Sequence, residues 1–327
     1  ALNFFDRNFQ APLINQYDVI LEHQISKNTV VSVSYIGSLG RSLPTFVDQN
    51  YTRTGTTNTF TVIGGDLGGQ TFTLPLYARA LTTFGAMTRI ESTVSSEYNA
   101  LVFQANRRFT DGLQFQVSYT FAKATDTNQN SATFTQTNSP YDLFDRSYDN
   151  GPSNFDIRHK FVASAVYAPT LYKGSKTNFL HYVLNGWSLA PIFTFYSGRP
   201  FDGSVSGASL NGTNGDTRFP LNPRNFYRLP ALTNFDARLS KRFKITESVN
   251  IEFLAEAFNV TNRTHVFNVG SALYTRATNT CAAVNGLAGV PGANNLCRRN
   301  DFYTEPTGTD STLYRERQIQ FSARLQF

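Results

Sequence analysis

The chain has 327 residues, of which 40% are hydrophobic and 14% aromatic, while only 16% are charged. Soluble domains carry roughly 25% charged residues, so this composition is unusual for one, yet no segment has the run of about 18 apolar residues that a membrane-spanning helix needs. The net charge of +6 comes from Lys and Arg residues spread along the chain, with no basic cluster, and we therefore expect no nucleic-acid partner.

Nine segments show the period-two alternation of a β-strand that has one apolar and one wet face. In chain order they are residues 16–24, 29–37, 95–109, 113–122, 160–167, 187–195, 234–242, 250–257 and 318–327. In the last segment, one parity holds Ile319, Phe321, Ala323, Leu325 and Phe327, and the other holds Gln, Ser and Arg. The pattern predicts an all-β fold whose strands each carry a continuous apolar face.

The connections between these segments differ in length, and most are either short or long. Residues 25–28, 110–112 and 243–248 are short enough for hairpin turns, and residues 169–185 are of intermediate length. The remaining connections, 38–94, 124–156, 198–233 and 262–315, are long. Short turns on one side and long loops on the other are typical of an antiparallel transmembrane β-barrel, with periplasmic turns and extracellular loops. A soluble β-sandwich is the alternative, but it gives no reason for such sorting.

Lipid explains the high aromatic content. Hydrocarbon cannot satisfy backbone N–H and C=O groups, so a spanning sheet must close on itself, with apolar rows facing lipid and polar rows facing a wet lumen. A periplasmic C-terminus then puts Tyr167 and Trp187 together at the periplasmic interface. Tyr119 and Phe121 fall near the outer interface, where aromatic girdles belong.

Six stretches also carry a family resemblance. They are SVSYIGSLGRSLP (32–44), SEYNALVFQANRRFTDGLQFQVSYTFAKATD (96–126), NGPSNFDIRHKFVASAVY (150–167), NGWSLAPIFTFYSGRPF (185–201), NFDARLSKRFKITESVNIEFLAEAFNVTNRTHVF (234–267) and RQIQFSARLQF (317–327). In this order they resemble the C-terminal half of a TonB-dependent outer-membrane receptor of the Oar-like group. Members of that group carry a carboxypeptidase-regulatory-like domain, a plug and then the barrel. The alternating residues Ile319, Phe321, Ala323, Leu325 and Phe327 also resemble the C-terminal signal for barrel assembly.

The resemblance implies a larger protein. Receptors of this kind have about 22 strands around a plugged lumen, whereas residues 1–327 provide about nine strands, with no plug and no segment that contacts TonB. We interpret residues 1–327 as the C-terminal part of one barrel domain. Because the chain starts at Ala1 rather than Met, on the outer side, we expect it to begin within an extracellular loop. The remaining barrel and plug would come from the same precursor or from a second chain.

Cys281 and Cys297 are the only cysteines and share one long loop, with fifteen residues between them. At the cell surface, which is an oxidising environment, this pair predicts a disulfide. Metal binding is the alternative interpretation, but no histidine lies nearby.

Eight charged residues occupy the parity that would face the lumen: Arg108, Lys160, Asp236, Arg238, Arg242, Glu252, Glu256 and Arg324. Those on the two neighbouring segments 234–242 and 250–257 would lie on adjoining wet faces, where opposite charges can pair. Two roles stay open for the set. It is either a structural ladder that also holds a plug, or a contact surface for the transported ligand.

No residue pattern points to catalysis. The four histidines have no metal-ligand spacing, and no nucleophile motif is present, so we expect no cofactor, no metal and no enzymatic activity. A barrel hydrolase is the alternative. His159, with Asp156, Arg158 and Lys160, is interpreted as a hydrogen-bonded structural cluster. The acidic residues Asp142, Asp145 and Asp149 raise the question of calcium, but residues 126–130 lack the Gly and the Glu of an EF-hand loop.

Taken together, the sequence predicts a receptor and transporter of the bacterial outer membrane, in contact with outer-membrane lipid. Loops on a rigid scaffold are where recognition usually resides, so ligand capture is assigned to residues 38–94 and 262–315. The resemblance implies that the plug shifts when the TonB complex pulls it from the periplasm, and that the barrel is the wall of the passage. The alternative function is a structural or adhesive surface barrel without transport.

Overall fold

The computed structural model of the chain describes residues 2–127, 141–175, 178–207, 209–213, 217–246, 248–277, 281, 294–299, 306–309 and 314–327. Most of them lie in strands, in agreement with the predicted all-β class. Among these residues, no helix combines the length and apolarity needed to cross a bilayer.

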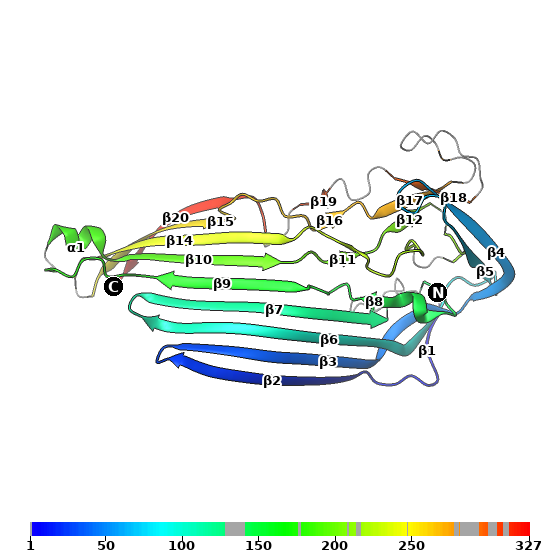
Figure 1. The fold of residues 1–327 in the computed structure, drawn as a ribbon, viewed down its shortest axis with the longest axis horizontal. Helices are drawn as coiled ribbons and strands as arrows, with labels where there is room; N and C mark the ends of the chain where they lie inside the picture. Colours follow the sequence, from blue (N-terminus) through cyan, green and yellow to red (C-terminus); the bar gives the residue numbers. More distant parts are fainter. Residues whose placement is uncertain are drawn as a thin grey trace.

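Nine long strands lie side by side in one sheet, called here the main sheet (Figure 1). They are β2 (Leu13–Ser26), β3 (Thr29–Asp48), β6 (Met87–Thr110), β7 (Leu113–Thr127), β9 (His159–Tyr167), β10 (Trp187–Tyr196), β14 (Leu232–Lys244), β15 (Asn250–Phe258) and β20 (Gln318–Gln326). Neighbours on this path pair antiparallel, and their order in the sheet is their order in the sequence. Each strand contains or overlaps one of the nine predicted segments, so that prediction is confirmed.

The two ends of the main sheet differ (Figure 1). At the turn end, short connections join β2 to β3, β6 to β7 and β14 to β15, and the C-terminus lies there. The β6–β7 turn places Asp111 and Gly112 at positive φ, 54° and 75°, as the two-residue hairpin turns with right-handed twist require. A longer connection between β9 and β10, with the helix α1 (Phe179–Leu184), lies at the same end. The long connections lie at the opposite end, the loop end.

The register sorts side chains onto two faces. Val33, Phe103, Tyr119, Phe161 and Phe195 are cross-strand neighbours in one row from β3 to β10. The adjacent row of cross-strand neighbours contains Ser32, Gln104 and Ser118, and its side chains lie on the opposite face. The apolar face is exposed; Phe253 is 52% and Phe321 80% accessible. A continuous exposed apolar face is a liability in water but suits contact with hydrocarbon.

The main sheet is open. β2 and β20 are its two outermost strands, and no described strand pairs with the outer edge of either. Every residue of β2 is exposed, as are all residues of β20 except the last. Closure into a barrel and the predicted total of about 22 strands therefore lie beyond what these nine strands show.

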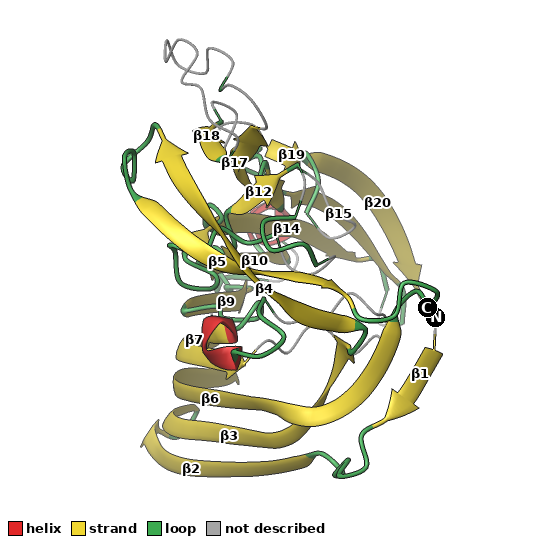
Figure 2. Cartoon of the chain, turned by 90° about the vertical axis from the view of Figure 1, so that its right-hand side faces the viewer, coloured by secondary structure: helices red, strands yellow, loops and turns green. Residues whose placement is uncertain are grey.

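A second β-structure, called here the loop layer, is built from the long connections. Its five-stranded sheet has the order β12 (Ser204–Ser206), β17 (Ala272–Ala277), β18 (Asn295–Arg298), β4 (Tyr51–Ile63) and β5 (Thr71–Arg79). Phe60, Val62, Phe219, Tyr274 and Leu296 are fully or almost fully buried in its core. In Figure 2, which faces the loop end, the β4–β5 hairpin crosses the space around which the main sheet curves.

Shorter elements complete the fold. β11 (Pro200–Phe201) pairs with β13 (Tyr227–Arg228), and β16 (Asn268–Val269) with β19 (Pro306–Gly308). β1 (Leu2–Phe5) pairs parallel with the start of β6, and β8 (Asn150–Pro152) pairs with the end of β7. A 3₁₀ helix covers Arg146–Asp149. β3 and β6 also continue past the predicted segments, to Asp48 and from Met87, so the long connection between them is largely strand rather than loop.

Candidate functional site

Six of the eight predicted wet-face charges come together on three adjacent strands. The register places Arg238 opposite Glu256, and Arg242 opposite Glu252, which in turn lies opposite Arg324. Nη2 of Arg238 is 2.5 Å from Oε1 of Glu256, and Nη2 of Arg242 is 3.7 Å from Oε1 of Glu252. Arg238, Arg242, Glu252, Glu256 and Arg324 therefore form an alternating charge ladder across β14, β15 and β20, and Asp236 lies beyond its loop end. Whether this ladder contacts a plug or a ligand stays a prediction.

The other two predicted charges lie elsewhere. Lys160, at the loop end of β9, has its Nζ 5.3 Å from the centre of the Tyr196 ring, a cation–π contact. Arg108 lies near the turn end of β6, where its main-chain N–H donates to the carbonyl of Asn28. Neither side chain belongs to the ladder.

A polar pocket lies at the loop end of the ladder. It has a volume of about 230 Å³. Its lining includes Asn234, Asp236, Phe258, Asn259, Tyr314 and Gln318. The carboxylate of Asp236 accepts from Nδ2 of Asn234 at 2.9 Å and from the main-chain N–H of Asn259 at 2.8 Å. Asp236 is thus a fixed acceptor inside the pocket, the kind of group that orients a small polar ligand.

Asn259 builds the rim of this pocket. Its backbone has a φ of 48°, a left-handed conformation that Asn adopts more readily than most residues. Its Nδ2 donates to the carbonyls of Arg263 and Arg315 at 2.9 and 3.0 Å, and its Oδ1 accepts from the N–H of Arg263 at 2.9 Å. The buried Asn259 side chain therefore ties the segment leaving β15 to the segment entering β20. No periodicity or motif in the sequence marks this residue.

His265 is buried beside a second, smaller cavity. Among the described residues, neither ring nitrogen has a hydrogen-bond partner, and the ring packs edge-on against Tyr314, with centroids 5.5 Å apart. Burial lowers the pKa of His265, and the nearby charge of Arg263 lowers it further, so the imidazole is neutral near pH 7. The cavity, about 170 Å³, is also lined by Asn262, Thr264 and Thr309.

Two buried ion pairs hold the long connections in place, one to each other and one to the main sheet. Arg218 and Asp149, both with almost no exposed side chain, approach to 3.2 Å. Arg224 pairs with Asp126 near the end of β7, and both side chains are buried. These arginines come from the long connection between β10 and β14, so the contacts join segments about 70 to 100 residues apart in sequence. No local pattern of residues predicts these ion pairs.

The acidic residues that raised the question of calcium have protein partners. Asp149 accepts from the N–H of Tyr141 and pairs with Arg218. Asp142 accepts from the hydroxyl of Tyr77 at 2.7 Å, and Asp145 caps the N–H of Ser147. Within the described part of the chain, no group of three or more His, Cys, Asp or Glu is placed to hold a metal ion.

The cluster around His159 is hydrogen-bonded. The carboxylate of Asp156 accepts from the N–H of Ala124 at 2.8 Å and from the guanidinium groups of Arg158 and Arg228. Nδ1 of His159 lies 2.8 Å from the hydroxyl of Tyr119. This network matches a structural role at the start of β9.

The four predicted interfacial aromatics occupy opposite ends of the main sheet. Tyr119 and Phe121 flank His159 towards the loop end. Tyr167 is the last residue of β9 and Trp187 the first of β10, so both lie at the turn end. The row Ile319, Phe321, Ala323, Leu325 is exposed along β20, followed by the exposed Phe327. Their roles at a membrane interface and in assembly stay predictions.

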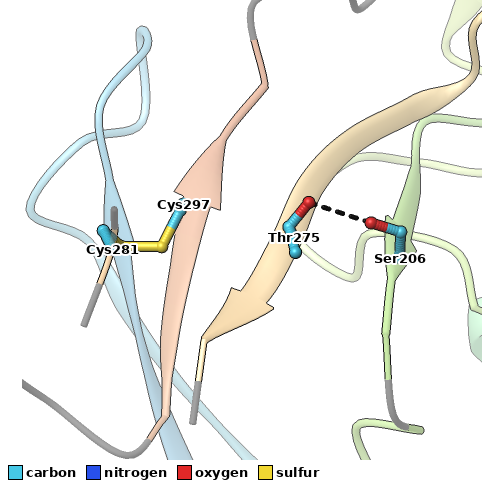
Figure 3. Close-up of a disulfide and its surroundings, with 4 residues drawn as sticks. All are labelled: Ser206, Thr275, Cys281 and Cys297. Carbon is cyan, nitrogen blue, oxygen red and sulfur yellow. Dashed lines mark hydrogen bonds between the residues drawn. A yellow bond between two sulfur atoms is a disulfide. The ribbon is translucent and has the colours of Figure 1, made fainter. Parts of the chain in front are cut away.

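The predicted disulfide is confirmed. Cys281 and Cys297 are bonded, with Cα atoms 5.6 Å apart, which excludes the alternative of metal binding by free thiolates. Figure 3 shows the bond beside β18, together with the 2.9 Å hydrogen bond between the hydroxyls of Ser206 and Thr275 on β12 and β17. The disulfide thus closes a loop on the loop layer.

The chain was compared with protein families, curated proteins and solved structures. A family model described as an outer membrane beta barrel domain matches residues 1–223 and 217–286. No curated protein matches the chain. Among solved structures, the outer membrane transporter YddB from Escherichia coli is similar, with 12% sequence identity and a TM-score of 0.48 over 82% of this chain. That alignment covers 32% of the transporter, so this chain spans about a third of its length.

Proposed function

The chain belongs to the outer membrane β-barrel domain family and thus to the bacterial outer membrane, and from this premise we propose that it is part of the barrel wall of a TonB-dependent receptor. In this proposal the receptor takes up a ligand at the cell surface and moves it across the membrane with energy supplied by the TonB complex. The chain itself has no enzymatic role.

The observation that carries the proposal is the open main sheet. β2 and β20 both run towards the turn end, so joining them directly would create a parallel pair in an otherwise antiparallel sheet. Unpaired strand edges are not tolerated in hydrocarbon. Further strands must therefore lie between β2 and β20, and large barrels of this kind enclose a plugged lumen. We assign the plug and the missing strands to the rest of the receptor.

The orientation follows from the two ends. Short turns of outer-membrane barrels face the periplasm and long loops face the outside, so we place the turn end in the periplasm and the loop layer at the cell surface. The charge ladder and the pocket around Asp236 then lie on the lumen side, below the loop layer. This supports a passage whose wall offers both charges and a fixed carboxylate to a polar ligand or to the plug.

Energy coupling has a direct test. The intact receptor, in nanodiscs, is presented to the purified periplasmic domain of TonB from the same bacterium, and binding is measured by biolayer interferometry. We expect saturable binding that disappears when the receptor's N-terminal TonB-contacting segment is deleted. Absence of binding by the intact receptor would contradict the proposal and favour a structural or adhesive barrel without transport.

A further inference from the structure

The connection between β9 and β10 is more than a turn. Unlike the three short hairpins at the turn end, it carries a row of exposed apolar and aromatic side chains. They are Leu171, Phe179, Leu180, Tyr182, Val183 and Leu184. Phe179 is 76% exposed. Such a patch on a short helix marks a surface that is covered in the working protein.

Hydrogen bonds fix this connection against the main sheet. Nζ of Lys241 donates to the carbonyl of Val183 at 3.0 Å and to that of Asn185. The indole N–H of Trp187 donates to the same Val183 carbonyl at 2.9 Å. Asn185 and Tyr172 exchange two further hydrogen bonds, of 2.9 and 2.7 Å. The helix α1 is therefore held in one place beyond the end of β10 and β14.

Lys241 is an exception on the apolar face. Its register partners are Trp187 on β10 and Phe253 on β15, and the residue is only 6% exposed. Its Nζ lies 4.9 Å from the centre of the Trp187 ring. A lysine on a lipid-facing row is costly unless its charge reaches the interface or protein acceptors. The two carbonyls at the end of α1 supply those acceptors. We therefore place the membrane–water interface at the level of Lys241.

An apolar groove begins at this point and runs over the outer face of the main sheet. Its walls and floor are Trp187, Leu239, Phe253, Ala255, Phe321 and Ala323, and its volume is about 410 Å³. Ala255 lies between Leu239 and Phe321 in the register, and Ala323 lies opposite Phe253. These two small side chains lie between larger ones and form the floor of an apolar groove that can hold an alkyl chain.

The turn end carries exposed lysines. Lys27 and Lys173 in its connections and Lys244 at the end of β14 are exposed, and Asp111 in the β6–β7 turn is an exposed carboxylate. Lys173 directly follows Tyr172, which is hydrogen-bonded to Asn185, the residue that caps the C-terminus of α1. Exposed lysines near a bilayer surface attract anionic headgroups.

We propose that the turn end binds one anionic phospholipid. An acyl chain lies in the groove between Phe253 and Phe321, the phosphate lies near Lys173, and α1 lies in the headgroup layer. The groove continues the apolar face that family membership places in the membrane, so the proposal rests on that location and not on transport. A receptor that failed to bind TonB would leave it intact.

The test uses native mass spectrometry of the complete protein, released from nanodiscs that contain phosphatidylglycerol. The wild type retains one phosphatidylglycerol, and Ala255→Phe, which fills the floor of the groove, retains roughly tenfold less. The matched control is Ala163→Phe, on the same face of β9 between Val117 and Phe193 but outside the groove. It retains the lipid as the wild type does. Equal retention by both variants, or none by the wild type, overturns the proposal.

A second measurement applies even if Ala255→Phe does not fold. The fluorescence of Trp187 is isolated by subtracting the signal of Trp187→Phe, and brominated phosphatidylglycerol is titrated into micelles of the wild-type protein. We expect quenching that saturates near one lipid per protein. Quenching that only follows the mole fraction of brominated lipid would show random contact and contradict a bound lipid.

Discussion

Glu256 on β15 accepts a hydrogen bond from Arg238 on β14 at 2.5 Å, and it accepts a second from Gln320 on β20. One carboxylate therefore links three neighbouring strands on the wet face. The pairing is set by the register of the β14–β15 hairpin, in which Arg238 and Glu256 stand opposite each other. The wet face is thus ordered by charge as well as by backbone hydrogen bonds.

The link between Arg238 and Glu256 predicts coupling between the two residues. Arg238→Glu places two carboxylates opposite each other and should lower the free energy of unfolding by about 1 kcal/mol. The double variant Arg238→Glu/Glu256→Arg, in which the two charges are swapped, should restore most of the lost free energy of unfolding. Because Arg238 is 55% exposed at its side chain, the coupling should stay below about 1 kcal/mol. Urea unfolding in micelles, carried out as a double-mutant cycle, measures this coupling energy. A coupling energy of zero would show that the two side chains lie close together without stabilising each other.

The buried pair Arg218 and Asp149 should matter more. Arg218→Met removes the guanidinium group that pairs with the buried Asp149 carboxylate, and we expect a local destabilisation of the loop layer by about 3 kcal/mol. Native-state hydrogen exchange at Val205 and Tyr274 measures it. The control Arg158→Met leaves Asp156 with Arg228 and should change exchange little. Equal effects from both substitutions would refute this account.

Removing the disulfide should affect the loop layer and spare the main sheet. Cys281 and Cys297 have a sequence separation of 16. For a loop of this size, the chain-entropy model gives a stabilisation by the disulfide of about 3 kcal/mol. We expect the double substitution to Ser to expose the loop layer to protease while the strands stay resistant. Thiol labelling of the wild type without reductant should find no reactive cysteine in this chain. Unchanged proteolysis would mean that the bond is dispensable for the loop layer.

His265 predicts a dependence of local stability on pH. Its pKa is lowered in the folded state from the ordinary 6.5, so the unfolded segment binds a proton more readily than the folded one. Stability is fully present above the unfolded pKa and is lost as the pH falls from about 6.5 towards the lower, folded pKa. Hydrogen exchange of residues 262–267, corrected for intrinsic rates, should therefore be faster at about pH 5 than at about pH 7.5. The variant His265→Phe should lose this difference; if it persists, another group is responsible.

Strand alternation made the main sheet predictable, because each long strand separates two environments along its whole length. Arg238 and Glu256 could be expected on adjoining wet faces because a short turn joins their two strands. Within the loop layer, β12 and β18 could not be predicted because they have only three and four residues, too few to show a period. Its core joins Phe60, Phe219 and Tyr274 from three separate connections, and no local pattern records such packing.

The site could be predicted only in part for the same reason. Parity placed Asp236 on the wet face, but its fixed position depends on the left-handed Asn259 23 residues later. Lys241 falls on the apolar parity, and only the tertiary position of α1 explains how its charge is satisfied. Contacts of this kind follow from the assembled fold rather than from spacing.

The central claim is that the main sheet is one section of a larger closed barrel. Electron cryomicroscopy of the intact protein, extracted from outer membranes into nanodiscs, tests it most directly. We predict that the outer edges of β2 and β20 each pair with a further antiparallel strand and that a plug contacts the ladder around Arg238 and Glu256. A map in which β2 and β20 pair with each other, or in which two sheets pack as a sandwich, would contradict the account.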